Sequence, residues 1–91
     1  MESARDLPHI IEILRRQQVR QGDLHLVLDC VITQATVLKT LPLPAVVLDT
    51  ASEMKARALE LKRVSLLPKF VVEDLLEESI TKLELAQKPA Q

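Results

Sequence analysis

The sequence predicts an all-α fold, a small antiparallel bundle of about four helices. Apolar residues recur at spacings of three and four in four successive segments, as they do in helices that pack one face on other helices. The chain has a single glycine, whereas tight β-hairpins usually need residues that accept positive φ. Prolines and one glycine turn separate the four segments by short connections, which favours antiparallel packing of neighbouring helices.

The first helix is predicted at 7–21. Its core-facing side is apolar and consists of Leu7, Ile10, Ile11 and Leu14. The same register continues as polar Gln18 and Gln21. Ser3 or Asp6 is placed to cap the start of this helix, because a short polar side chain can accept a hydrogen bond from a free backbone N–H of the first turn.

The second helix is predicted at 23–41, with Asp23 as its cap. Its apolar face consists of Leu24, Leu28, Val31, Ala35 and Leu38. Residues 24–32 also alternate between the two sides of an extended chain, so the alternative is an α+β fold with a strand at 24–32. The helix is favoured because the alternation fails at Gln34 and Thr36, whereas the helical spacing continues beyond them.

The third and fourth helices are predicted at 44–63 and 68–86. The apolar face of the third consists of Val47, Ala51, Met54, Ala58 and Leu61. The apolar face of the fourth consists of Val72, Leu76, Ile80 and Leu83. These segments complete a single helical domain that spans residues 1–91 and ends in a frayed tail at 87–91.

A short motif recurs at three of the predicted helix starts. The sequences LPHII, LPAVV and LPKFV share the pattern Leu-Pro-x-apolar-apolar. Proline is favoured in the first helical turn, where its missing N–H would have had no partner. The motif therefore predicts helix starts, and its unequal intervals argue against a repeat protein.

Composition argues against enzymatic chemistry. A single cysteine allows neither an internal disulfide nor a thiolate metal cluster, and phosphate-binding loops need glycines that this chain lacks. Cys30 and His25 would project about 140° apart on a helix, too far apart to form a nucleophilic pair. His25 and Asp29 together supply only two metal ligands. We therefore expect no catalytic site, no cofactor, no metal and no small-molecule substrate.

The sequence predicts a cytoplasmic protein. Its first residues lack the long apolar run of a signal peptide. The most apolar stretch, 24–48, is interrupted by charged residues and prolines and is therefore not a membrane span. The single cysteine fits a reducing compartment.

The second helix carries more apolar residues than one core face needs. A second stripe beside the first consists of Leu26, Cys30, Val37 and Leu41. Phe70, the sole aromatic residue, projects from the polar side of the fourth helix, where it either anchors an interface or tucks under the connection at 64–68. The surplus predicts a non-enzymatic protein–protein interaction module, a small adaptor, regulator or chaperone-like subunit. Its partner would be a second copy, as in a homodimer, or another protein.

The alternative function is a small nucleic-acid-associated regulator, of the repressor or antitoxin kind. Arg15, Arg16 and Arg20 lie just before the glycine turn, which superficially resembles a helix-turn-helix. The helix that would enter the groove carries two acidic residues, one basic residue and a broad apolar face, which is a poor recognition surface. The net charge of −1 also gives no overall attraction to nucleic acid or to an anionic membrane.

Charge is also unevenly distributed along the second half of the chain. Residues 55–63 are mainly basic and residues 73–84 are mainly acidic. Antiparallel packing of the third and fourth helices would place these segments opposite each other, and the same asymmetry could instead align two chains.

Overall fold

The computed structural model describes residues 7–87. Within this range the chain forms four α-helices, a 3₁₀ turn at Gln21–Asp23, and no strand. The helices are α1 (Leu7–Arg15), α2 (Leu24–Leu38), α3 (Ala45–Leu61) and α4 (Lys69–Gln87). The predicted all-α fold is therefore confirmed, and the alternative of a strand at 24–32 is wrong because those residues lie in α2.

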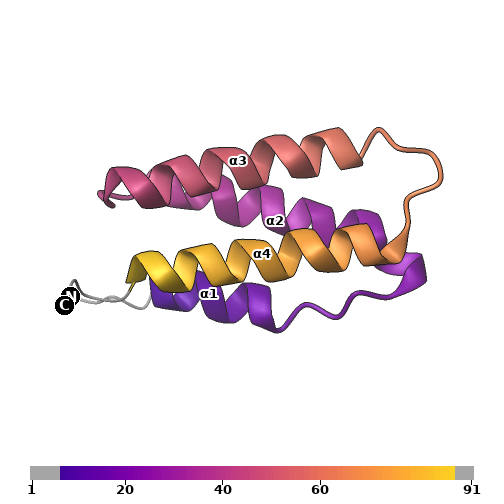
Figure 1. Cartoon of the computed structure of the whole chain (residues 1–91), viewed down its shortest axis with the longest axis horizontal. Helices are drawn as coiled ribbons and strands as arrows, with labels where there is room; N and C mark the ends of the chain where they lie inside the picture. Colours follow the sequence, from indigo (N-terminus) through magenta and orange to yellow (C-terminus); the bar gives the residue numbers. More distant parts are fainter. Residues whose placement is uncertain (1–6, 88–91) are drawn as a thin grey trace.

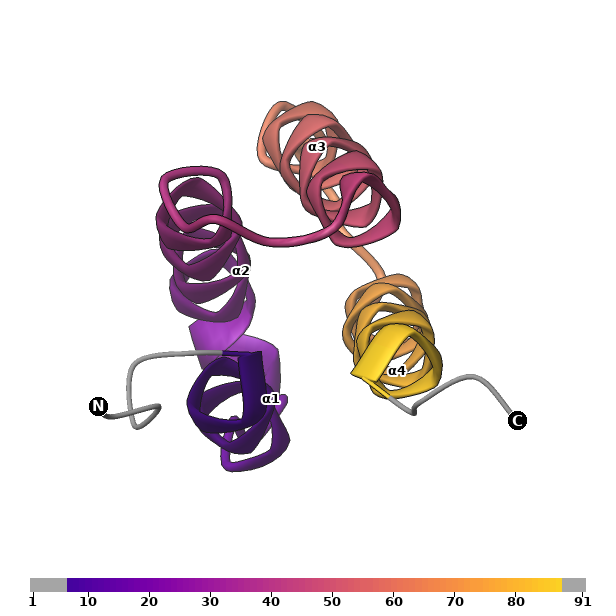
Figure 2. The same cartoon turned by 90° about the vertical axis from the view of Figure 1, so that its left-hand side faces the viewer.

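The helices form an up-and-down bundle in which successive helices run in opposite directions (Figure 1). Each helix packs against the next, and α1 also packs against α4. The end-on view in Figure 2 places α2 and α4 at opposite corners, so their outer faces point away from each other. A surface on the outside of α2 is therefore separate from a surface on the outside of α4.

The proline motifs mark helix starts as predicted. Pro8 lies in the first turn of α1, Pro44 occupies the N-cap position of α3, and Pro68 immediately precedes α4. Asp23 also occupies the predicted N-cap position of α2, but its side chain accepts no capping hydrogen bond. The other predicted capping residues, Ser3 and Asp6, lie outside the described residues.

The first helix is shorter than predicted. It ends at Arg15, and residues 17–20 have no regular secondary structure, so the predicted range of 7–21 is wrong at its end. The polar register positions Gln18 and Gln21 explain the difference. Further helical turns would place these polar groups on the core side, and a short helix in water is stabilised mainly by burying an apolar face.

The core is aliphatic and lies between the helices. The side chains predicted to face it on α1 and α2 are all buried, and most of those on α3 and α4 are buried too. Leu61 and Ile80 are the exceptions, being half-buried. Each fully buried Leu, Ile or Val contributes about 1.5–3 kcal/mol, so the core is the main source of stability.

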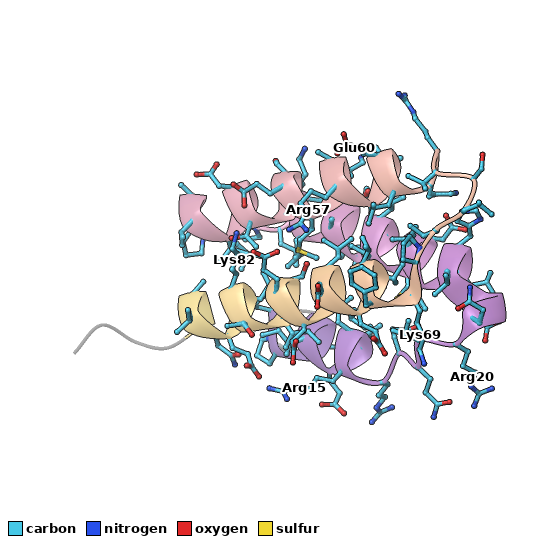
Figure 3. All side chains as sticks on the ribbon, turned by 45° about the vertical axis from the view of Figure 1, so that its right-hand side comes forward. Arg15, Arg20, Arg57, Glu60, Lys69 and Lys82 are labelled. Carbon is cyan, nitrogen blue, oxygen red and sulfur yellow. The ribbon has the colours of Figure 1, made fainter. Side chains whose placement is uncertain are left out.

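Ion pairs connect α3 with its neighbours. Arg57 donates a hydrogen bond to Glu78 of α4, and Lys82 of α4 lies 3.3 Å from Glu53 (Figure 3). Lys62 at the end of α3 pairs instead with Asp29 of α2, at 2.5 Å. Part of the charge asymmetry between the third and fourth helices is therefore matched by ion pairs within one chain.

The predicted frayed tail begins at Gln87, which is helical, and its other residues, 88–91, lie outside the described residues.

Candidate interaction surfaces

The second apolar stripe of α2 is only partly exposed. Leu26 is 66% exposed and Val37 is 38% exposed, and both lie on the outer side of the helix. Cys30 is half-buried, and Leu41, which lies beyond the end of α2, is half-buried as well. The exposed part of the stripe therefore consists of two apolar side chains about 16 Å apart, a distance of three helical turns.

Leu26 also lines a groove at the end of the bundle. The groove has a volume of about 400 Å³ and lies between the start of α2 and the connection from α3 to α4. It is lined by Gln21, Gly22, Leu24, His25, Leu26 and Ser65–Pro68. Leu66 in this lining is 90% exposed, the highest exposure among the large apolar residues of the described chain. The outer face of α2 thus continues into an apolar loop.

Phe70 does not tuck under the α3–α4 connection. It is 63% exposed and lies in the first turn of α4. Phe70 belongs to α4, which lies at the opposite corner of the bundle from α2 (Figure 2). Of the five residues predicted to bind a partner, two are therefore exposed on α2, two are half-buried, and Phe70 is exposed on another helix.

The polar residues of α2 do not converge on a site. Asp29 pairs with Lys62 of α3, and Cys30 lies on a different side of the helix. Burial raises the pKa of the Cys30 thiol above its ordinary value, so the reactive thiolate is a minor species at neutral pH. Within residues 7–87 no group of three or more His, Cys, Asp or Glu side chains is arranged to hold a metal ion.

Two of the three arginines of the alternative function are paired with carboxylates. Arg15 pairs with Glu84 of α4, and Arg16, which directly follows α1, lies 3.1 Å from Glu12 of α1. Arg20 donates a hydrogen bond to Gln18 and points away from the helices (Figure 3). Nucleic-acid binding through these residues remains an alternative prediction.

A second groove lies between α1 and α4. It has a volume of about 690 Å³. Its apolar lining consists of Leu14, Val19, Leu76 and Ile80, and its polar lining of Arg15, Glu73, Asp74, Glu77, Thr81 and Glu84. Four carboxylates and one guanidinium therefore surround an apolar floor. Negative potential accumulates in a cleft that carries an excess of one charge sign beside apolar walls.

Leu66 and the α1–α4 groove were not predicted from the sequence. The motif SLLP places two adjacent leucines in a connection. Because adjacent residues cannot both face the core, this motif indicated that one of the two leucines would be exposed, and that one is Leu66. The groove forms because α1 ends at Arg15, and the polar residues at the core-facing positions after Leu14 were the sequence feature that indicated this end.

In the part of the chain that the structure describes, no helix combines the length and apolar character that a membrane crossing requires. Comparison of this chain with models of protein families, with curated proteins and with solved structures finds no match.

Proposed function

We propose that this protein is a non-enzymatic protein–protein interaction module that self-associates through the outer face of α2 and the adjoining α3–α4 connection. The observation that carries this proposal is the exposure of Leu26 and Leu66 in one groove, with Val37 further along the same helix. Leucines so exposed keep apolar surface in contact with water, and a partner that covers them gains free energy.

The charges on the outer sides of α2 and α4 favour α2 as the helix that binds a second copy. Besides its threonines, the outer side of α2 carries His25 and Asp29, and Lys39 directly follows the helix. Asp29 is already paired with Lys62. Such a face can meet its own copy without strong repulsion of like charges. The outer side of α4 is acidic and would repel its own copy.

The expected affinity is modest. Full burial of a leucine is worth about 1.5–3 kcal/mol, and association costs about 4–15 kcal/mol in lost freedom of motion. Three partly exposed apolar side chains from each copy therefore support at most a net interaction of roughly micromolar strength, which is reached at the favourable end of both ranges. The proposed setting is the cytoplasm, where reducing conditions keep Cys30 as a free thiol.

Sedimentation velocity of the wild type and matched variants tests this proposal. From about 1 to 100 µM, the range that brackets the expected dissociation constant, the wild type should pass from monomer to dimer. Leu26→Glu and Val37→Glu should remain monomeric with unchanged helicity by circular dichroism. The matched control Ala56→Glu adds the same charge at an exposed position of α3 and should dimerise like the wild type. A monomeric wild type throughout this range would contradict the proposal.

A further inference from the structure

The groove between α1 and α4 exists because the two helices differ in length. With 9 and 19 residues, α1 and α4 are about 13 and 28 Å long, so α1 covers only part of α4 (Figure 1). Beyond Arg15 the chain continues without regular structure, and Val19 from this segment forms part of the wall. Residues of α4 from Glu73 to Glu84 line this open channel, and the start of α4 lies beyond the end of α1 (Figure 1).

The floor of this channel is apolar and the rim is acidic. Ile80 and Val19 are half-buried lining residues, while Leu14 and Leu76 close the floor from beneath. On the rim, Glu73 lies 3.9 Å from Lys69, and Glu84 pairs with Arg15. The rim therefore has cationic partners only at its two ends.

Asp74 and Glu77 lie between those ends. Both are exposed, and no ion pair involves either of them among residues 7–87. Their carboxylates stand beside apolar surface without a cation from the described chain. A ligand that offers apolar side chains together with positive charges would complement both properties at once.

We infer that the α1–α4 groove binds a cationic amphipathic helix of a partner protein. The lined part of α4 spans about 16 Å, which matches a partner helix of about three turns. Apolar residues of that helix at positions i, i+3, i+4 and i+7 would cover Val19 and Ile80, and its flanking Lys or Arg residues would meet Asp74 and Glu77. The groove lies on a different face from the outer side of α2, so this inference does not depend on self-association.

A designed peptide tests the groove directly. The probe is a fluorescein-labelled amphipathic peptide of about three helical turns, with Leu at i, i+3, i+4 and i+7 and Lys elsewhere. The control peptide has Glu in place of every Lys. By fluorescence anisotropy at low salt, the full chain should bind the Lys peptide and not the Glu peptide. Amide signals of residues 14–19 and 73–84 should shift in an NMR titration with the Lys peptide.

Two double variants with equal charge separate a local from a general charge effect. Asp74→Asn with Glu77→Gln should weaken binding of the Lys peptide about three- to ten-fold, because two exposed charge pairs are lost. Asp49→Asn with Glu60→Gln removes two exposed carboxylates of α3 outside the groove, and Glu60 points away from the bundle (Figure 3). The affinity of this control for the Lys peptide should lie within two-fold of that of the wild type, because only the overall charge of the protein has changed.

Three results would overturn the inference. The first is absence of binding or equal binding of the Glu peptide, and the second is an equal loss in both double variants. The third is a loss of self-association on Asp74→Asn with Glu77→Gln, since the groove would then hold a second copy of this chain. Failure of the α2 proposal would appear separately, in the sedimentation of Leu26→Glu and Val37→Glu.

Discussion

Glu78 lies between two cations at the interface of α3 and α4. Its carboxylate accepts a hydrogen bond from Arg57, and a carboxylate oxygen lies 4.0 Å from the ammonium nitrogen of Lys82. The hydrogen bond from Arg57 and its positive charge, with a smaller effect of Lys82, hold the pKa of Glu78 below its ordinary value of 4.5. The ionised form is therefore favoured in the folded protein.

This lowered pKa predicts how Glu78 contributes to stability as the pH changes. A carboxylate whose pKa is lower in the folded state stabilises fully above its ordinary pKa, and the contribution is lost as the pH falls through the lowered value. We therefore expect the wild type to exceed Glu78→Gln in stability at pH 7, and this difference to shrink below about pH 4.5. Urea unfolding of both proteins over this pH range measures it. A difference that grows on acidification, or that Glu60→Gln reproduces, would contradict this interpretation.

Cys30 illustrates why single polar residues carried little information in the sequence. On its own, a cysteine near a histidine and an aspartate raises the question of a reactive site. In the structure Cys30 packs against the core, and burial raises its pKa. Asp29 forms an ion pair with Lys62, a residue that lies 33 positions further along the chain. No local pattern in the sequence could show that pairing.

At the scale of elements, helical spacing placed most of the core-facing residues correctly. The buried residues of α2 follow the predicted register, because a face that packs on two neighbours must repeat with the period of the helix. The end of α1 was not predicted. Charged and polar residues after Leu14 are compatible with a helix in isolation, and only packing decides whether further turns are stabilised.

The two faces of α2 should respond differently to truncation. Leu28 is fully buried and Leu26 is largely exposed, so Leu28→Ala leaves a cavity and Leu26→Ala does not. We expect Leu28→Ala to lower the free energy of unfolding by about 2–5 kcal/mol. Leu26→Ala should change it by about 0.5 kcal/mol or less when measured on the monomer. Urea denaturation at low protein concentration compares them, and similar losses would mean that Leu26 is buried in the fold.

For the molecule as a whole, the surfaces differ in chemical character. The outer face of α2 combines two exposed apolar side chains with polar ones, and the groove beside Leu66 carries few charges, whereas the groove along α4 is acidic. The apolar surplus of α2 was evident from the sequence. That Phe70 lies on the helix diagonally opposite α2 was not evident, because the spacing of residues along one helix does not encode the order of helices around the bundle (Figure 2).

The net charge and the paired arginines predict weak contact with nucleic acid. With a net charge of −1, and with Arg15 and Arg16 held by carboxylates, we expect no retention on a DNA duplex at about 0.15 M salt. Anisotropy of a labelled duplex measures this. Salt-sensitive binding that disappears when Arg15, Arg16 and Arg20 are replaced by alanine would support the alternative function instead.

The most direct test of the central claim is an isotope-filtered NMR experiment on a mixture of labelled and unlabelled protein. If a second copy covers the outer face of α2, the methyl groups of Leu26 and Val37 should show intermolecular nuclear Overhauser effects, at protein concentrations about ten times the expected dissociation constant. Intermolecular effects confined to α4, or none at all under these conditions, would contradict the account.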